Sequence, residues 1–192
     1  MTSTQDVARE LPIGSIVVAD HQTAGRGRHD RTWEAPSGTA LLVSFVLPRN
    51  TLLSLAAGVA AAQACGPSVR LKWPNDLLVG ERKLGGILVE ATADRAVCGI
   101  GINLTAAPEG AAMLNQPRDR VLGRLMVAMD EWTIATPDRI LSRWRELSAT
   151  LGRRVRVDVG SKSTEGLAED LGPNGELIVD GFAFVAGSVT HL

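Results

Sequence analysis

The sequence predicts an α+β protein in which a larger domain, residues 1–150, precedes a small all-β domain, residues 151–192. Three observations support this division. Short apolar segments that suit β-strands gather between residues 69 and 104, and helical stretches lie on both sides of them. After Gly152 the pattern changes to short alternating segments separated by turn residues. With 192 residues and 45% apolar side chains, the chain is long enough to bury a core.

The first half of the chain reads as strands around one helix. Residues 15–20 are a β-branched run opened by Gly14, and residues 39–48 form a second strand that ends at a proline. Residues 52–65 are rich in Leu and Ala without an internal proline, which predicts a helix. Four further strands are predicted over 69–73, 76–80, 84–91 and 96–104, with a turn at 80–82.

The second half begins with a predicted loop over 105–118, which contains two prolines and no hydrophobic period. Amphipathic helices follow over 119–134 and 137–149, the second opened by a proline in the favoured first-turn position. Five short strands in the remaining stretch of about 40 residues suggest a small β-barrel. Because so short a segment is marginally stable alone, we expect it to dock on the larger domain.

Composition excludes several classes of protein. The formal net charge of −1 gives no support to nonspecific nucleic-acid binding, which needs a basic surface. Cys65 and Cys98 lie far apart in apolar segments, as expected of buried reduced thiols. The N-terminal residues do not resemble a signal peptide, and no apolar stretch reaches the ~18 residues of a membrane span. We therefore expect a soluble, cytoplasmic protein.

The arginine loop, residues 21–33 (HQTAGRGRHDRTW), is the most unusual stretch. Glycines allow its backbone to approach a ligand closely, Arg26, Arg28 and Arg31 are donors suited to phosphate, and Trp33 offers a face for stacking. The alternatives are a solvated polar hairpin and, least favoured, a nucleic-acid contact. The loop is too short to make a basic patch by itself.

A second polar group lies in LKWPNDLLVGERKLGGILVE, residues 71–90. Lys72, Asn75 and Asp76 lie at predicted strand ends around a proline, where side chains often face a cleft. The alternative is a surface ion pair between Lys72 and Asp76 worth under about 1 kcal/mol. Lys83 stands beside Gly85 and Gly86 at a strand start, and a cation beside a glycine pair favours an anionic ligand.

Other chemistries find little support. GIGIN, residues 99–103, is not a dinucleotide-binding loop, because the full glycine pattern and a following helix are missing. It suits a closely packed strand that ends in Asn103. The three histidines are scattered without metal-ligand spacing, so we expect no protein metal site.

Taken in order, GRGRHDRTW, KWPND, RKLGGILVE and GIGIN resemble the catalytic domain of the biotin–protein ligases, also called biotin–[acetyl-CoA-carboxylase] ligases. The resemblance covers nearly the whole chain, and the four motifs together are highly specific. It implies a mixed sheet backed by helices, then a small SH3-like barrel. It also implies that biotin and Mg·ATP give biotinyl-5′-adenylate, from which biotin passes to a lysine of a biotin carboxyl carrier domain of a carboxylase.

The resemblance also assigns site residues. It makes Lys83, Arg26 and Arg28 the cations at the reaction centre, with Asp76 as a candidate proton acceptor. The residues that it implies for biotin binding are Ser3, Thr4, Gln5, Gln22, Gly25, Arg26, Gly27, Arg28, Lys83, Gly85 and Gly86. Those that it implies for ATP or adenylate binding are Arg28, Arg31, Trp33, Lys72, Asn75, Asp76, Lys83 and Asn103. The metal would be held largely by phosphates and water.

Two features depart from the family pattern. Gln5 stands where the family has Asn, so its contact in the biotin pocket is expected to be longer or shifted. The chain also begins almost at this motif, whereas a strand precedes it in the family, so either the sheet edge is rebuilt or the given start is late. A DNA-binding domain and repressor activity are not expected, and the protein is expected to be a monomer or weak homodimer. The alternatives are a lipoate or octanoate ligase or transferase of the same fold, and a catalytically weak biotin-binding relative.

Overall fold

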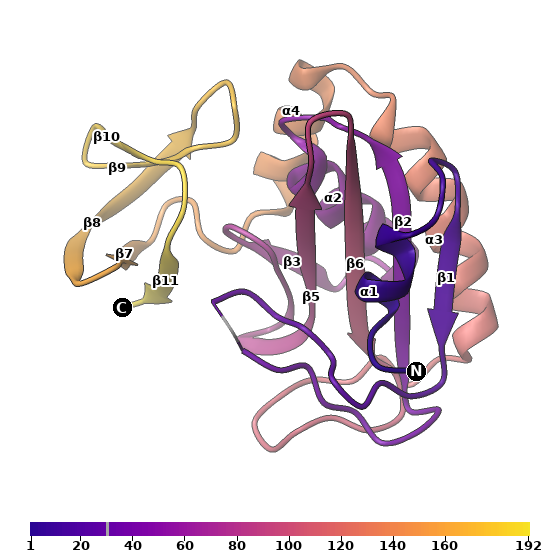
Figure 1. Cartoon of the computed structure of the whole chain (residues 1–192). Helices are drawn as coiled ribbons and strands as arrows, with labels where there is room; N and C mark the ends of the chain where they lie inside the picture. Colours follow the sequence, from indigo (N-terminus) through magenta and orange to yellow (C-terminus); the bar gives the residue numbers. More distant parts are fainter. Residues whose placement is uncertain (30) are drawn as a thin grey trace.

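The structure is a computed structural model that describes residues 1–29 and 31–192. Figure 1 shows a helix-backed sheet with a smaller, separate sheet at the C-terminal end. The elements of the first part are α1 (Thr4–Arg9), β1 (Ile16–Ala19), β2 (Ala40–Pro48), α2 (Leu53–Cys65), β3 (Val69–Lys72), β4 (Asp76–Val79), β5 (Arg82–Ala91), β6 (Arg95–Asn103), α3 (Arg118–Thr133) and α4 (Pro137–Leu147). The second part holds β7 (Arg154–Val159), β8 (Lys162–Leu171), β9 (Leu177–Val179), β10 (Phe182–Phe184) and β11 (Ser188–His191).

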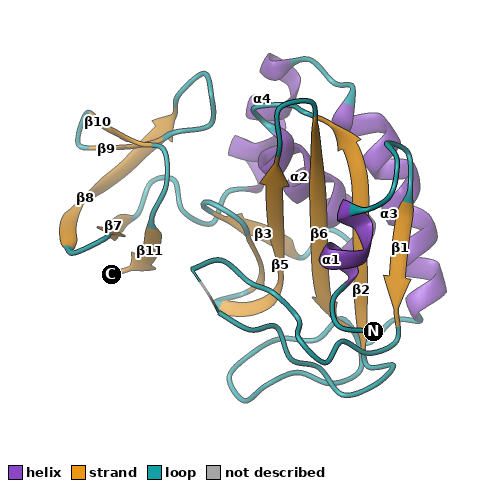
Figure 2. Ribbon diagram, in the orientation of Figure 1, coloured by secondary structure: helices purple, strands orange, loops and turns teal. Residues whose placement is uncertain are grey.

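The larger sheet has six strands in the order β1-β2-β6-β5-β4-β3. The expected mixed sheet is antiparallel in all of these pairings, and the parallel contact is an isolated bridge between Leu71 and Ser148. Helices α2, α3 and α4 lie on one face of the sheet and α1 on the other (Figure 2). The predicted α+β class is confirmed, and the face beside α1 is left open for a ligand.

Helix α2 is the centre of the core. It packs against the sheet on one side and against α3 and α4 on the other. Its sequence is apolar all round, as expected of a helix with no solvent face, and most of its residues are buried. Alanines such as Ala56 and Ala60 are completely buried, so the neighbouring elements approach it closely. The packed helix α2 therefore supports the strands of the larger sheet, which carry several of the polar site residues.

The hairpin between β4 and β5 contains the turn predicted at 80–82, with Gly80 at a φ of 60°. The strand β5 begins at Arg82, two residues earlier than predicted, so Lys83 lies within the sheet rather than in a loop. Asp76 pairs with Gly86 across this hairpin. The paired strands therefore set the positions of Lys83 and Asp76.

The C-terminal strands form one antiparallel sheet in the order β10-β9-β8-β7-β11. This arrangement fits an SH3-like fold, although the strand pairings of the described residues do not close it into a barrel. None of the helices in the described chain is long and apolar enough to span a bilayer.

Candidate active site

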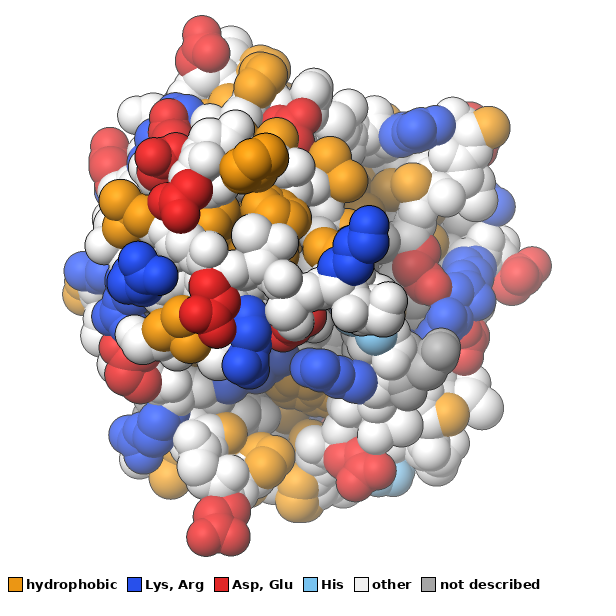
Figure 3. All heavy atoms as spheres, turned by 90° about the vertical axis from the view of Figure 1, so that its left-hand side faces the viewer, with side chains coloured by type: hydrophobic (Ala, Val, Ile, Leu, Met, Phe, Trp, Pro, Cys, Tyr) orange, Lys and Arg blue, Asp and Glu red, His pale blue; other side chains and the backbone are white. Residues whose placement is uncertain are grey.

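A cleft of about 370 Å³ lies beside α1, on the open face of the six-stranded sheet. Its walls come from the arginine loop, from β5 and β6, from the turn between β3 and β4, and from the first residues of β11. Figure 3 views the molecule from the side of the C-terminal sheet and shows Lys and Arg side chains bordering a hollow. The cleft thus brings together segments from both ends of the chain.

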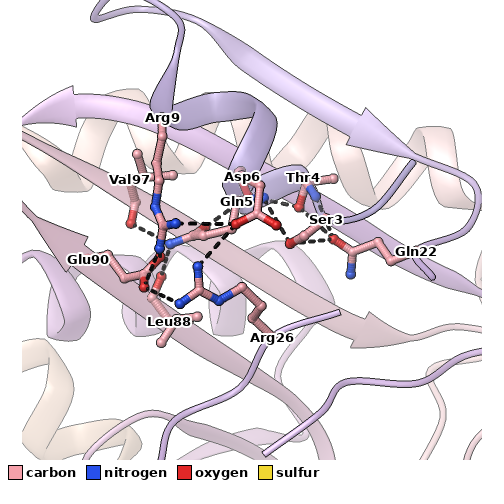
Figure 4. Close-up of polar contacts among 11 residues, drawn as sticks. Ser3, Thr4, Gln5, Asp6, Arg9, Gln22, Arg26, Leu88, Glu90 and Val97 are labelled. Atoms are coloured by element: carbon pink, nitrogen blue, oxygen red, sulfur yellow. Dashed lines mark hydrogen bonds and ion pairs between the residues drawn. The ribbon is translucent and has the colours of Figure 1, made fainter. Parts of the chain in front are cut away.

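Neutral polar groups at the start of α1 form one end of the cleft (Figure 4). Ser3 caps the helix, because its Oγ accepts a hydrogen bond from the Gln5 amide at 3.2 Å. Oε1 of Gln22 accepts from the Thr4 amide at 2.7 Å and from the Thr4 hydroxyl at 3.0 Å. Ser3 and Thr4 are nearly fully buried, so this group is preorganised before any ligand binds.

Gln5 fastens α1 to the sheet. Its Nε2 donates to the carbonyls of Val97 at 3.0 Å and Leu88 at 3.4 Å (Figure 4). Ser44 Oγ lies 3.1 Å from Gln5 Oε1 and 2.9 Å from Thr4 Oγ1, so its single proton serves one of the two oxygens. A Cβ at Gly99 would lie 2.6 Å from Gln5 Oε1. The longer Gln side chain therefore depends on a glycine opposite it.

The described part of the arginine loop, residues 21–29 and 31–33, has the contacts of a hairpin. Arg26 forms a β-bridge with Thr32, the Gly27 amide donates to the Arg31 carbonyl at 2.7 Å, and the Trp33 amide donates to the Gly25 carbonyl at 3.0 Å. A Cβ at Gly25 would lie 2.1 Å from the Trp33 carbonyl oxygen, so this position requires glycine. The close approach at Gly25 is thus to the other arm of the hairpin, and the approach to a ligand that the sequence predicted stays a prediction.

Trp33 ends this hairpin and packs over Gly101 of β6. A Cβ at Gly101 would lie 2.7 Å from Trp33 Cε2, so the glycine admits the indole ring. The indole N–H is buried and has no hydrogen-bond partner among the described residues. An unpaired buried donor beside a cleft suits a ligand that brings an acceptor.

Basic side chains form the other end of the cleft. Lys83 Nζ lies 2.6 Å from Asp76 Oδ1, and Arg28 donates to Asn75 Oδ1 at 3.2 Å. Burial lowers the pKa of Arg28 and the pKa of Lys72, with Asp76 opposing both shifts. An anionic ligand would offset the cost of that desolvation, because its charge attracts both side chains and favours their charged forms.

The C-terminal sheet completes the site. Gly187 to Thr190 line the cleft, and the Gly187 carbonyl accepts from Arg28 at 3.5 Å. The fully buried Thr150 accepts from the Trp73 amide at 3.1 Å, and its Oγ1 lies 3.3 Å from His191 Nε2. The β3–β4 turn, which carries Asn75 and leads into Asp76 at the start of β4, is therefore tied to the last strand of the chain.

Most of the predicted site residues line this one cleft. The structure brings together Ser3, Thr4, Gln5, Gln22, Arg26, Gly27, Arg28, Arg31, Trp33, Lys72, Asn75, Asp76, Lys83 and Gly86. Gly25, Gly85 and Asn103 are outside the lining. Gly85 admits the neighbouring strand, since a Cβ there would lie 2.5 Å from the Gly101 carbonyl oxygen. Asn103 is buried and its Nδ2 donates to the Ala112 carbonyl at 3.0 Å, which braces the loop after β6.

Several site residues were missed from the sequence. Ser44 is a lone polar residue in an apolar strand, and that pattern was available as a signal. The short helix α1 was also missed, although Ser3 before a turn containing Asp6 is a helix-start pattern. Nothing local marks the β11 residues, because docking of the C-terminal sheet brings them to the cleft.

Within residues 1–29 and 31–192, no group of three His, Cys, Asp or Glu side chains is arranged to hold a metal ion. Both cysteines are buried and unbridged, as predicted. Burial raises the pKa of each thiol to about 12. Neither cysteine lines the cleft; the ionisable side chains that line it are Asp76, Lys72, Lys83, His29 and the arginines Arg26, Arg28 and Arg31.

Comparison with known sequences gives a consistent group of relatives. Residues 1–105 match the family described as the biotin/lipoate A/B protein ligases. The biotin–[acetyl-CoA-carboxylase] ligase of Mycobacterium tuberculosis is 35% identical, with 93% of this chain and 79% of the relative covered. The bifunctional ligase/repressor BirA of Escherichia coli is 31% identical over 89% of this chain, which spans 63% of that protein.

Solved structures agree with the sequence relatives. The biotin protein ligase from Aquifex aeolicus, in complex with biotin and ATP, superposes with a TM-score of 0.83 and 26% identity. The match covers 99% of this chain and 94% of the Aquifex chain. It therefore includes the C-terminal sheet as well as the helix-backed one.

Proposed function

This chain belongs to the biotin/lipoate A/B protein ligase family, and we propose that it is a biotin–protein ligase. It activates biotin with ATP and transfers it to a lysine of a biotin carboxyl carrier domain. The names of the relatives and the two ligands of the Aquifex structure support this activity. The structural observation that carries it is a single cleft with a neutral polar end and a basic end. Biotin has this same polarity, with a neutral ring system and an anionic tail.

At the neutral end, the ligand would meet Ser3, Thr4 and Gln22. The Ser3 and Thr4 hydroxyls already lie within hydrogen-bond reach of Gln22 Oε1, which fixes the orientation of all three side chains. Such preorganisation reduces the entropy lost on binding. We assign this group to the polar ring of biotin. Gln5 lies behind it and supports it through the sheet.

In the first step, a carboxylate oxygen of biotin attacks the α-phosphorus of ATP, the bond to the β-phosphate breaks, and pyrophosphate leaves. This reaction brings two anions together, so its barrier is largely electrostatic. We assign the charge neutralisation to Lys83 and Arg28, which lie at the basic end of the cleft, with Lys72 nearby. The catalytic role expected for Arg26 stays a prediction, because its guanidinium group faces Asp6 and Glu90.

The adenine and ribose are assigned to the side of the cleft near Trp33 and Arg31, where the indole N–H of Trp33 has no partner within residues 1–29 and 31–192. Asn103 would act there indirectly, through the loop that it braces. Mg²⁺ would enter with ATP and be held mainly by phosphate and water oxygens.

In the second step, the ammonium group of the acceptor lysine gives one proton to Asp76 or to water, and the neutral amine attacks the acyl carbon of the adenylate. The new amide forms as the bond to the AMP oxygen breaks, AMP leaves, and the second amine proton passes to water. Asp76 is the carboxylate of the basic end, and we assign it the orientation of the incoming amine.

We also propose that residues 1–150 form the catalytic domain and that residues 151–192 form a separate SH3-like domain. The enzyme would work in the cytoplasm, where ATP is available.

The decisive experiment is mass spectrometry of a carrier domain after incubation with this protein, biotin and Mg·ATP. A gain of one biotinyl group on one lysine is expected, together with release of pyrophosphate. A parallel reaction with lipoate tests the rival substrate of the family. Modification by lipoate but not biotin would replace the proposed substrate, and tight biotin binding without product would indicate a binding protein.

A further inference from the structure

The two arginines of the sequence Gly25-Arg26-Gly27-Arg28 are held at different places. Arg26 donates to Asp6 Oδ1 at 3.1 Å and to Glu90 Oε1 at 3.0 Å, at the side of the cleft formed by α1 and β5 (Figure 4). Arg28 donates to Asn75 and to the Gly187 carbonyl, at the basic end. The hairpin is thus fastened at two points across the cleft.

Arg26 belongs to a compact network of four charges (Figure 4). Arg9 of α1 donates to both oxygens of Glu90 at 2.7 Å and to Asp6 at 3.3 Å. Two carboxylates and two guanidinium groups leave the network neutral, so its charges are already balanced within the protein. The four side chains are between 28% and 41% exposed, so salt screens their attraction and each pair contributes modestly.

The hairpin hydrogen bonds extend the effect of the Arg26 ion pairs to the rest of the described loop. The Arg26–Thr32 bridge and the Gly27–Arg31 hydrogen bond join its two arms, so holding Arg26 also restrains the opposite arm. A surface loop with few buried contacts opens at low free energy. Loss of even a modest ion pair therefore changes the open fraction measurably.

We propose that the carboxylates of Asp6 and Glu90 hold the arginine loop closed over the adenylate by pairing with the Arg26 guanidinium group. We call these two carboxylates the catch. Glu90 is a positioning residue, since it acts on the intermediate through Arg26. This role rests on the proposed function, because the molecule retained is biotinyl-5′-adenylate. The catch protects a reactive mixed anhydride from water until the acceptor lysine arrives.

The substitution Glu90→Gln tests whether Arg26 acts by pairing with Glu90 or by binding the adenylate directly. The enzyme is given biotin and Mg·ATP without acceptor, and pyrophosphate release is followed after the first turnover. Continued release measures adenylate that escapes and is replaced. The catch predicts about a two- to tenfold faster continued release, with a first-turnover rate within about twofold of wild type. An unchanged continued release would overturn the proposal, because the ion pair with Glu90 would then not retain the adenylate. A slower release would overturn it too, because it would mean that Arg26, once freed from Glu90, binds the anionic adenylate directly.

A charge exchange tests the pairing itself. The Arg26→Glu variant should release the adenylate much faster than wild type, because the new carboxylate would repel those of Asp6 and Glu90. Adding Glu90→Arg restores two acids and two bases in the network, and retention should return toward wild type. If the double variant leaks as much as Arg26→Glu, Arg26 acts on the ligand and the catch is refuted. Arg9→Gln is the matched control, because Arg9 shares both carboxylates but lies outside the loop, and it should retain the adenylate.

Limited trypsin digestion gives a readout that needs no ligand. The loop contains Arg26, Arg28 and Arg31, and mass spectrometry identifies cleavage after each. Glu90→Gln should be cut several-fold faster in this loop than wild type or Arg9→Gln, and added salt should narrow the difference. Equal loop cleavage would refute the catch. If no variant releases pyrophosphate, the proposed function fails, while the digestion still decides whether the catch exists.

Discussion

Lys83 Nζ lies 2.6 Å from Asp76 Oδ1, across the hairpin formed by β4 and β5. Gly86 lies beside the pair, and a Cβ there would be 3.6 Å from Nζ and 3.7 Å from Oδ1. The Lys83 side chain is 44% exposed, so its ammonium group remains accessible from the cleft. The same pair can therefore hold the lysine in place before an anionic ligand arrives.

Lys83→Ala should reduce the rate of adenylate formation by about 100-fold or more, because it removes a charge aimed at the developing transition state. The free energy of unfolding should change by less than ~1 kcal/mol, since the lost ion pair is half exposed. Biotin-dependent pyrophosphate release and thermal denaturation check the two effects. Lys162→Ala, at the start of β8, is the control for loss of a lysine. Parallel losses of activity and stability would contradict the assignment.

Gly101→Ala should raise the KM for ATP by about an order of magnitude. The new Cβ would lie 2.7 Å from the Trp33 ring, so the ring must move. Steady-state kinetics with varied ATP measures the effect. Gly123→Ala is the matched control, because a Cβ there meets no atom within 4 Å and alanine favours a helix. An unchanged KM for ATP would remove Trp33 from the nucleotide site.

His191 should make the protein less stable in mild acid. Burial, followed by the charges of Lys72 and Arg153, lowers its pKa from the ordinary 6.5, while Glu81 opposes the shift. The unfolded state therefore binds more protons just below about pH 6.5, and the free energy of unfolding falls as the pH drops through that value. The fall stops once the folded ring also becomes protonated.

His191→Gln tests this linkage, because glutamine can still accept from the Thr150 hydroxyl but does not titrate. The loss of Tm between about pH 7.5 and pH 5.5 should be smaller in the variant than in wild type. His21→Gln, at an exposed histidine, should behave like wild type. A His191 variant with the wild-type pH dependence would assign the acid sensitivity to other groups.

Cys65 and Cys98 should resist thiol reagents in the folded protein. Burial raises the pKa of both thiols to about 12, so almost no thiolate exists near pH 8. A colorimetric thiol assay should count no reactive cysteine in the native protein and two after denaturation. Rapid reaction of a native thiol would show that the surrounding core opens readily.

Local patterns predicted much of this fold and most of its site. Gly80 marks the β4–β5 turn, and the arginine-loop and KWPND motifs identified residues that meet in one cleft. Five short strands were predicted after residue 150, and β7 to β11 lie there. The family resemblance implied a place for Asn103 at the adenylate; its side-chain amide donates to the Ala112 carbonyl in the loop after β6, so direct binding stays a prediction.

Long-range relationships were beyond the reach of local patterns. Arg26 and Glu90 are 64 positions apart, and each alone reads as an ordinary surface charge. Ser188 and Thr190 line the cleft because β11 docks there, which no alternation of apolar residues foretells. A strand that faces solvent and a strand that lines a site can have the same local sequence pattern. Only the position of the surface opposite the strand distinguishes them.

The contact between Trp33 and Gly101 also gives the protein an internal optical probe. Its other three tryptophans, Trp73, Trp132 and Trp144, are at most 4% exposed, whereas Trp33 is half-buried at the end of the arginine loop. A small diffusing quencher of indole fluorescence would therefore reach Trp33 first. The loss of that quenching on adding biotin and ATP would report closure in real time, without an attached dye.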